Sequence, residues 1–418
     1  MGLYETLWRL CIPLLKRNAR LKEGFDSRCC ADGLEPADIW IHAASAGEAF
    51  LALSLIENLN PSGSLHILIT TNTQQGFDII QKGVETGKKN NPVSVACDYI
   101  PFDRPRLMEQ AVLRVFPKLM ILLETELWPG LLLALKQQHI KTVLINGRIT
   151  PKSLKHYMLW PSLWKTLGPD DILAISEDDA HRFAELFGPE KVQTMANIKF
   201  DRLKTAVSDT GNPLKTLLAG NAKFLVLGSV RQPEENQVAR IIQNVHTQLP
   251  ETIIGLFPRH MQRISHWTQA LDRLGISWKL RSQLNREPIP AGTVILWDVF
   301  GELNPAYALA SAAFVGGSLA PLGGQNFLEP MICGLTPVIG PFWKNFAWAG
   351  EEIFNQGLAI RADTLQSVAS ELIRQLGQPE SAHRQKIKAV NYLESKKGGT
   401  EQACRLIENL LTIRRNAL

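Results

Sequence analysis

The sequence is poor in cysteine and almost balanced in charge. Its six cysteines are scattered and none belongs to a C-x-x-C pair, so neither a disulfide framework nor a zinc site is indicated, and a reducing compartment is favoured. The 45 lysine and arginine residues exceed the 40 acidic residues by only five in 418 residues. This excess is compatible with an anionic substrate or a membrane surface, but it is too small to indicate a nucleic-acid partner.

Several signature motifs are also missing. No G-x-G-x-x-G follows the first predicted strand or opens the second half of the chain, and no P-loop is present, which argues against a nicotinamide dehydrogenase and an ATPase. The chain has no G-x-S-x-G hydrolase motif. It also has no D-x-D, the usual carboxylate pair for a metal-bound nucleotide diphosphate. We therefore expect no metal and no cofactor.

The N-terminus is an apolar segment with a basic edge. Its apolar residues include Leu3, Leu7, Leu10, Leu14 and Leu15, and its basic residues are Lys16, Arg17, Arg20 and Lys22. The segment is shorter than the roughly 20 residues that cross a bilayer, and it lacks the order of a signal peptide. Such a segment predicts an interfacial anchor on an anionic, cytoplasm-facing leaflet. The alternative is a first helix that packs on the domain.

Strand and helix patterns alternate through the rest of the chain. Strand-like runs lie at residues 39–43, 66–71, 119–123, 142–146 and 171–176, and then at 224–227, 252–257, 294–297, 313–316 and 336–339. A polar, turn-rich segment at 201–221 separates the two sets. Strands separated by helices predict parallel α/β sheets, so we expect two α/β domains with a ligand cleft between them.

Polar residues follow four predicted strands of the first half, at 70–73, 124–126, 146–148 and 176–177. Glu48 follows the remaining strand, at 39–43, and is the most informative residue of this half. A short apolar run passes through small residues into Gly47 and Glu48, where an amphipathic helical pattern begins. A ligand can approach the backbone closely at such a helix N-terminus. Ser45 and Glu48 also have the spacing of a capping box, and this stretch taken alone favours the cap.

Glycine-rich turns and basic residues follow the predicted strands of the second half. Such turns at helix N-termini bind phosphate, because free N–H groups and the helix dipole face the anion. Alternatively, Asn326 caps a helix with Glu329 as its partner, but this cap does not explain two Gly-Gly pairs, so we favour a ligand site. Its candidate residues are Ser229, Arg231, Pro258, Arg259, His260, Gly316, Gly317, Ser318, Leu319, Asn326 and Glu329.

Six short motifs occur in order along the chain. They are HAASAGE (42–48), ETELWP (124–129), NGR (146–148), NIKFD (197–201), PRH (258–260), and GGSL (316–319) with NxLEP (326–330). Together they make most of the chain similar to the 3-deoxy-D-manno-octulosonic acid (Kdo) transferases of Gram-negative lipopolysaccharide synthesis. The resemblance implies a GT-B fold, in which two Rossmann-like domains face each other across a cleft.

The expected domains follow from this resemblance and from the patterns above. We expect a membrane-anchor helix at residues 1–24 and an acceptor-binding domain at 25–205. A CMP-Kdo-binding domain is expected at 206–400, and a terminal helix at 401–418 is expected to cross back to the first domain. The chain departs from the family pattern at Ala46, Ala196, Arg231, Gln325 and Phe327, mainly in donor-side segments.

The resemblance also implies residue roles. Glu48 matches the residue regarded as the family's general base and Glu124 a second acidic position, and the donor-binding segments contain the candidates named above. A helix N-terminus lowers a carboxylate pKa, so Glu48 is expected to be ionised. The expected acceptor contacts are Ser45, Gly47, Arg148 and Lys152, although the basic residues fit a solvated face equally well.

The expected reaction is inverting, metal-independent transfer of Kdo from CMP-Kdo to a phosphorylated lipid A precursor, at the cytoplasmic side of the inner membrane and without a nucleic-acid partner. One rival is another GT-B enzyme, either a UDP-sugar transferase or a sugar 2-epimerase. A second rival is a catalytically inactive membrane-bound scaffold. Nucleotide selectivity separates the first rival from the expected enzyme, and turnover separates the second.

Overall fold

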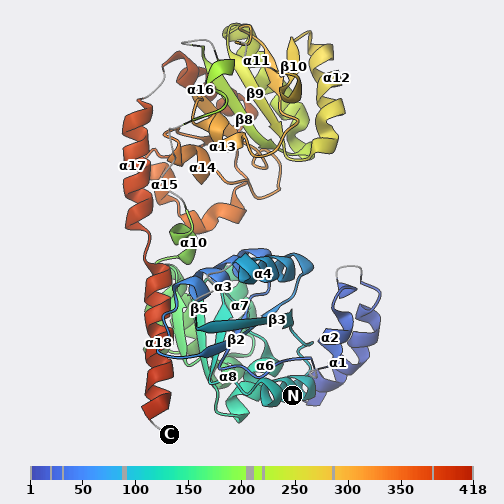
Figure 1. Cartoon of the computed structure of the whole chain (residues 1–418), viewed down its shortest axis with the longest axis vertical. Helices are drawn as coiled ribbons and strands as arrows, with labels where there is room; N and C mark the ends of the chain where they lie inside the picture. The colour runs from blue at the N-terminus through green and yellow to red at the C-terminus, as the bar shows by residue number, and fades with distance from the viewer. Residues whose placement is uncertain are drawn as a thin grey trace. The chain divides into compact units, whose positions relative to one another are not determined.

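The computed structural model describes residues 2–18, 21–30, 33–86, 92–203, 211–218, 222–284, 288–378 and 381–416. The chain divides into two compact units (Figure 1): unit 1 comprises Met1–Leu203 and Lys396–Leu418, and unit 2 comprises Lys204–Ser395. Arg20 of the predicted basic edge, and much of the predicted linker at 201–221, lie outside the described residues.

Unit 1 is built around a seven-stranded parallel sheet with the order β3-β2-β1-β4-β5-β6-β7. Its strands are β1 (Ile39–His42), β2 (Leu65–Thr71), β3 (Val93–Tyr99), β4 (Leu119–Leu123), β5 (Lys141–Gly147), β6 (Asp171–Ala174) and β7 (Val192–Thr194). Its helices are α1 (Gly2–Leu15), α2 (Phe25–Cys29), α3 (Ala46–Asn58), α4 (Gln74–Thr86), α5 (Pro105–Val115), α6 (Pro129–Gln137), α7 (Pro151–Tyr157), α8 (Pro161–Leu167), α9 (Glu177–Phe187), α10 (Ile198–Asp201) and α18 (Gly399–Asn416).

The strands of unit 1 are apolar on both faces because helices cover both. Trp40 of β1 packs in a core with α5, α6, α8 and α9, whereas its neighbours Ile39 and Ile41 pack in a second core with α3 and α18. Successive strand residues point to opposite faces, so a continuous apolar run serves two cores at once. The polar residues that follow each run therefore collect at the carboxyl edge of the sheet.

Helix α18 belongs to unit 1 although it is the last helix of the chain, and Figure 1 shows it beside the sheet of this unit. Ala403, Cys404 and Ile407 enter the core under α3. The Asp201 carboxylate fixes the start of the helix, because it accepts hydrogen bonds from the Gly398 N–H at 2.7 Å and from the N–H and hydroxyl of Thr400, each at 2.6 Å.

Unit 2 contains a second seven-stranded parallel sheet, with the order β10-β11-β9-β8-β12-β13-β14. Its strands are β8 (Phe224–Val230), β9 (Ile253–Pro258), β10 (Trp278–Leu280), β11 (Val294–Leu296), β12 (Ala312–Val315), β13 (Val338–Ile339) and β14 (Ile360–Arg361). Its helices are α11 (Glu235–Gln248), α12 (Ile264–Leu274), α13 (Leu303–Tyr307), α14 (Leu328–Ile332), α15 (Glu352–Asn355), α16 (Leu365–Gly377) and α17 (Ala382–Ser395).

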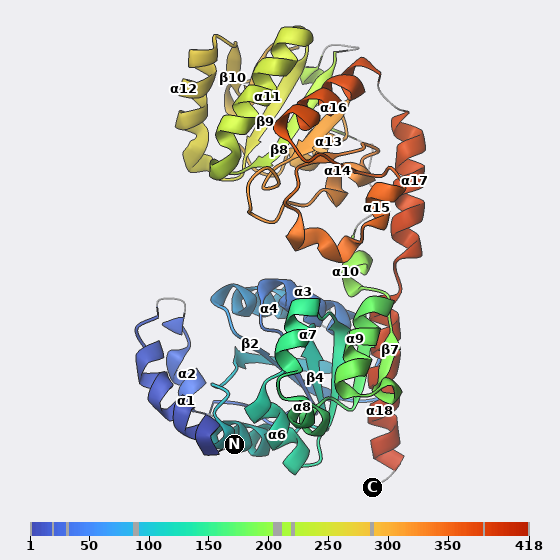
Figure 2. The same cartoon turned by 180° about the vertical axis from the view of Figure 1, so that it is seen from behind.

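Helix α1 packs on unit 1 with one face and exposes the other, and with α2 it lies along one side of this unit (Figure 2). Its inner face donates a hydrogen bond from Tyr4 to Asp103 at 2.7 Å and pairs Glu5 with Arg104 at 2.7 Å. Its outer face carries Leu3, Leu7, Leu10 and Leu14, which are 49–76% exposed. Among the described residues, no helix is long and apolar enough to cross a membrane.

Candidate active site

Glu48 lies at the carboxyl edge of unit 1, in the first turn of α3, and is only 6% exposed. Its carboxylate accepts hydrogen bonds from the Ala44 N–H and the Ser45 hydroxyl, each at 2.8 Å, and the Ser45 oxygen in turn accepts from the Glu48 N–H at 3.4 Å. Ser45 is thus the N-cap of α3, as the capping interpretation predicts. The same bonds hold the Glu48 carboxylate in one orientation, so the cap also positions it.

The environment of Glu48 raises its pKa to about 8, first through burial and then through the negative charge of Glu126, with a smaller contribution from Glu124. The hydrogen bonds from Ser45 and Ala44 oppose this shift without cancelling it. The expectation of a depressed pKa is therefore wrong, because burial and two neighbouring carboxylates outweigh the helix N-terminus. A carboxylate with this pKa is a stronger base than an ordinary glutamate and is poised near neutral pH.

Glu126 lies close enough to Glu48 to act on its pKa. It is not among the site residues predicted from the sequence. Its carboxylate accepts a hydrogen bond from the Trp128 indole at 2.8 Å and lies 3.9 Å from Nε2 of His42. His42 is fully buried, and burial lowers its pKa to about 4. Its Nδ1 lies 3.1 Å from the Thr70 carbonyl, so we assign the proton to Nδ1, which leaves the Nε2 lone pair facing Glu126.

Burial also raises the pKa of Glu126, and the charge of Glu124 raises it further. Together, Glu48, Glu126 and His42 form a buried group in which the two carboxyl groups bind protons more tightly than in water, whereas the imidazole binds its proton less tightly. Groups of this kind are typical of sites for acid–base chemistry.

Glu124, the predicted second acidic residue, is close enough for its charge to raise the pKa of Glu48. Its carboxylate forms an ion pair with Lys199, which the NIKFD motif supplies from α10. Glu124 also has a left-handed backbone, with φ of 55°, a conformation that is uncommon for residues other than glycine and often occurs at functional sites. The structure brings Glu124 next to Glu48, but its charge is already paired.

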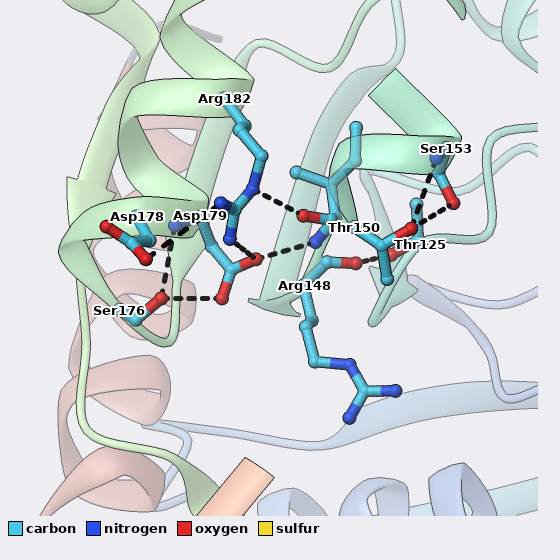
Figure 3. Close-up of polar contacts among 9 residues, drawn as sticks. Thr125, Arg148, Thr150, Ser153, Ser176, Asp178, Asp179 and Arg182 are labelled. Carbon is cyan, nitrogen blue, oxygen red and sulfur yellow. Dashed lines mark hydrogen bonds and ion pairs between the residues drawn. The ribbon is translucent and has the colours of Figure 1, made fainter. Parts of the chain in front are cut away.

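The loop after β5 holds Arg148, and Figure 3 shows how the loop is fixed. The Asp179 carboxylate accepts hydrogen bonds from the Ile149 N–H at 2.9 Å and the Ser176 hydroxyl at 2.6 Å, and it pairs with Arg182. The Arg148 carbonyl accepts a hydrogen bond from the Thr125 hydroxyl, whereas the Arg148 guanidinium points away from this cluster and forms none of the bonds drawn there (Figure 3). Arg148 is thus available for an anionic ligand.

The remaining predicted acceptor contacts are spread over two helices. Gly47 is exposed in the first turn of α3, next to Ser45 and Glu48. Lys152 is exposed on α7, which begins three residues after Arg148.

In unit 2, the N–H groups of the predicted phosphate-binding loop already have a hydrogen-bond acceptor within the protein. The fully buried carboxylate of Glu234 accepts hydrogen bonds from the N–H groups of Gly317, Ser318 and Leu319 and from Arg231 N–H at 2.9 Å. The expectation that these loop N–H groups are free for phosphate is therefore wrong: an internal anion occupies them. Glycine is required at 316, since a Cβ there would lie 2.6 Å from Glu234 Oε1.

Ser318 is a structural residue in this loop. Its hydroxyl donates to the Val315 carbonyl at 2.6 Å and accepts from the Gly340 N–H at 2.9 Å, and the side chain is buried. Ser229, at the end of β8, has a left-handed backbone with φ of 56°. Pro258, Arg259 and His260 follow at the end of β9, the next strand in the sheet, and the latter two are exposed.

Asn326 and Glu329 contact each other, but they do not form the predicted capping box, because the N-cap of α14 is Phe327 and has no side-chain cap bond. The Asn326 amide donates to Glu329 at 2.9 Å, and its oxygen accepts from the Leu328 N–H at 3.2 Å. Burial raises the pKa of Glu329, and the charge of Arg259 acts in the opposite direction. The arginine therefore lies close enough to influence this carboxyl group. No group of three or more His, Cys, Asp or Glu side chains in the described residues is arranged to hold a metal ion.

Comparison with known proteins agrees with this arrangement. Residues 13–202 match the model of the 3-deoxy-D-manno-octulosonic-acid transferase (kdotransferase) family. The chain is 29% identical to the 3-deoxy-D-manno-octulosonic acid transferase of Bordetella pertussis, covering 90% of this chain and 88% of the relative. It is 30% identical to a probable mitochondrial 3-deoxy-D-manno-octulosonic acid transferase of Arabidopsis thaliana, covering 72% and 68% respectively.

Two further similarities are more distant. The chain spans 57% of the length of a bifunctional glycosyltransferase/methyltransferase of Fusobacterium nucleatum, with 27% identity over 87% of its own length. The crystal structure of a glycosyltransferase from Rickettsia africae superposes with a TM-score of 0.57, covering 90% of this chain and 99% of that one, at 9% identity. At this identity the second likeness concerns the fold alone.

The two parallel α/β units have the GT-B fold, and the relatives define the protein as a glycosyltransferase. The chain belongs to the Kdo transferase family.

Proposed function

We propose that this enzyme transfers Kdo from CMP-Kdo to a phosphorylated lipid A precursor, with inversion and without a metal ion, and that Glu48 is the general base. The observation that carries the proposal is the Glu48 carboxylate, which is buried, held by Ala44 and Ser45, and raised in pKa to about 8. The base takes the proton from the acceptor hydroxyl as that oxygen attacks the anomeric carbon of Kdo. Such a step is typically worth about 10²–10⁴-fold in rate.

The donor is assigned to the carboxyl edge of unit 2. Arg231 and Arg259 follow adjacent strands there, and their guanidinium groups can neutralise the phosphate of a departing CMP by charge-assisted hydrogen bonds. Glu329, held by Asn326, is placed to accept hydrogen bonds from the ribose hydroxyls. The loop around Gly317 supports these groups as a rigid backbone, since Glu234 already uses its amides.

The acceptor is assigned to unit 1, with Arg148 and Lys152 meeting its phosphate groups. We also propose that α1 rests on the cytoplasmic surface of the inner membrane through Leu3, Leu7, Leu10 and Leu14. This leucine stripe is exposed while the opposite face of the helix packs on the domain, as in an interfacial helix. Replacing Leu7 and Leu10 with serine is expected to abolish sedimentation with anionic vesicles and to leave folding unchanged.

The test of the reaction uses the full chain, CMP-Kdo generated in situ and a tetraacylated lipid A precursor, in EDTA. We expect turnover by the wild type and a loss of at least about 10²-fold for Glu48→Gln. The matched control is Glu57→Gln, an exposed glutamate on the same helix, which is expected to keep full activity. Turnover of Glu48→Gln at the wild-type rate contradicts the assignment of the base, and turnover of a UDP-sugar in place of CMP-Kdo contradicts that of the donor.

A further inference from the structure

A mainly apolar pocket of about 260 Å³ lies in unit 1 between α1 and the sheet. Its apolar lining includes Trp8, Leu15, Leu21, Ile100, Met108 and Trp128. An apolar cavity of about 150 Å³ is large enough to bind benzene. The pocket in unit 1 is therefore large enough for a segment of an alkyl chain.

Arg28 brings a buried positive charge to the wall of this pocket. The side chain is 3% exposed, donates one hydrogen bond to the Asn72 carbonyl at 2.8 Å and lies over the Tyr99 ring at 4.5 Å. Within the described ranges, no carboxylate lies at ion-pair distance from Arg28, although the charge of Asp98 acts on it from farther away, and its Nε has no hydrogen-bond partner. Burying an arginine in this way is unfavourable unless something compensates the charge.

The other charged residue at the pocket does not supply this compensation. Asp103 accepts hydrogen bonds from the Tyr4 hydroxyl at 2.7 Å and from the N–H groups of Gly130 at 2.9 Å and Leu131 at 2.7 Å. Its oxygens are therefore engaged in holding α1 and the start of α6. Arg28, whose Nε has no hydrogen-bond partner, remains the polar group of the pocket that can donate to a further acceptor oxygen.

The pocket adjoins the candidate active site through a shared side chain. Trp128 lines the pocket, donates its indole hydrogen bond to Glu126 at 2.8 Å and packs edge-on against His42 with ring centroids 6.4 Å apart. A molecule that fills the pocket therefore touches the residue that contacts Glu126 and His42. This continuity favours the acceptor as the occupant over a lipid that takes no part in the reaction.

We propose that the pocket binds one acyl chain of the acceptor, with an oxygen at the head of that chain, a carbonyl or a hydroxyl, hydrogen-bonded to Arg28. The identity of the occupant rests on the proposed function, since the acceptor there is an acylated glycolipid. The proposal that the pocket binds an acyl chain does not depend on the proposed function. The pocket then selects the acceptor by its acyl chain and aligns the sugar of the acceptor with Glu48.

Binding is tested without turnover. The probe is a monoacylated glucosamine phosphate with a brominated chain, used below its micelle concentration, and the readout is quenching of tryptophan fluorescence. We expect saturable quenching that falls in Trp8→Phe and Trp128→Phe. We also expect affinity at least about tenfold weaker in Arg28→Met, which removes a hydrogen bond to a charged group, and in Leu21→Phe, which fills the pocket.

The control is Leu113→Ser, which changes the exposed face of α5 and is expected to keep the wild-type affinity. A brominated phospholipid of equal chain length serves as the second source of an acyl chain and is expected to bind more weakly. Equal binding of the phospholipid overturns the assignment to the acceptor. Unchanged affinity in both folded pocket variants overturns the pocket itself.

Kinetics separate this inference from the proposed reaction. For Arg28→Met and Leu21→Phe, we expect KM for the tetraacylated acceptor to rise about tenfold, with KM for the deacylated acceptor and for CMP-Kdo unchanged. An equal rise for both acceptors contradicts the acyl-chain role. If the wild type shows no Kdo transfer at all, the proposed function fails, while the fluorescence experiment still decides whether the pocket binds an acyl chain.

Discussion

The carboxyl edges of the two sheets hold buried carboxylates in opposite ways. In unit 2, Glu234 accepts four backbone N–H groups and joins the glycine loop to the start of α11. In unit 1, Glu48 accepts one N–H and one hydroxyl and lies close to Glu126 and Glu124. Burial raises the pKa of both groups, but only Glu48 also experiences neighbouring negative charges.

This difference separates a structural carboxylate from a reactive one. Four N–H donors compensate the charge of Glu234, so its removal is expected to damage the fold. Glu48 has only two hydrogen-bond donors around it, so its charged form is unfavourable. Replacing Glu48 is therefore expected to damage the reaction and not the fold. The same residue type at equivalent edges of two similar sheets thus performs two tasks, and the number of donors around it distinguishes them.

The largest expected effect on stability is at Glu234. Glu234→Ala leaves the N–H groups of Arg231, Gly317, Ser318 and Leu319 without their acceptor, and each unsatisfied buried donor costs about 1–3 kcal/mol. We expect a loss of at least about 3 kcal/mol in the free energy of unfolding, measured with denaturant. The control is Glu251→Gln, an exposed site in the same unit. A loss no greater than that of the control means that Glu234 does not hold the loop.

Replacing Glu48 is expected to raise the free energy of unfolding, the opposite of the effect at Glu234. The folded protein binds the Glu48 proton more tightly than the unfolded chain, because the pKa rises from 4.5 to about 8 on folding. The wild type therefore loses stability as the pH rises from about 4.5 to about 8. Glu48→Gln lacks this titration and is expected to gain about 1–2 kcal/mol on the wild type between pH 6 and pH 8. A parallel pH dependence of the two proteins contradicts the raised pKa.

Arg148 tests whether a cation at the carboxyl edge of unit 1 meets the acceptor. Arg148→Gln is expected to raise KM for the phosphorylated acceptor about tenfold, because a charge-assisted hydrogen bond is lost, with KM for CMP-Kdo unchanged. The exposed Lys152→Gln is expected to change the same KM by about twofold or less. An unchanged KM in Arg148→Gln, or an equal rise with an acceptor that lacks phosphate, removes Arg148 from the acceptor site.

The smallest expected effect is at Glu126. Glu126→Gln removes the neighbouring negative charge that raises the pKa of Glu48 most. The pKa of Glu48 then falls, and a larger fraction of this carboxyl group is ionised. At pH 6.5 we expect kcat to rise by roughly a few-fold relative to the wild type. Glu124→Gln is expected to give a smaller rise, since Lys199 already pairs that carboxylate. A large loss of kcat in Glu126→Gln at every pH would instead make Glu126 a proton donor or acceptor in the reaction.

The fold followed closely from the apolar runs of the sequence. The runs at 119–123 and 142–146 correspond to β4 and β5, and the predicted GT-B architecture is confirmed. The strand β3 was missed because its residues are only partly buried and show no continuous apolar run. The predicted run at 336–339 contains β13, whereas the two-residue strand β14 was missed because it is too short to show a period of its own.

The sequence located the strand ends of the site but not its electrostatics. The capping pattern of Ser45 and Glu48 is correct, whereas the direction of the Glu48 pKa depends on burial and on Glu126, which is 78 residues away in the chain. Glu234 was not predicted to hold the glycine loop, because a glutamate that follows a proline is typical of the first turn of a helix. Only the folded loop shows that its carboxylate reaches the amides of Gly317 and Ser318.

The central claim is that Glu48 is the base and must lose its proton before it acts. The most direct measurement is the single-turnover rate of Kdo transfer between pH 6 and pH 9.5 for the wild type and Glu48→Gln. We expect the wild-type rate to rise with pH and to level off above a single ionisation with a pKa of about 8, and the residual rate of Glu48→Gln to be flat. A wild-type rate that is flat or falls over this range, or a Glu48→Gln profile with the same rise, contradicts the account.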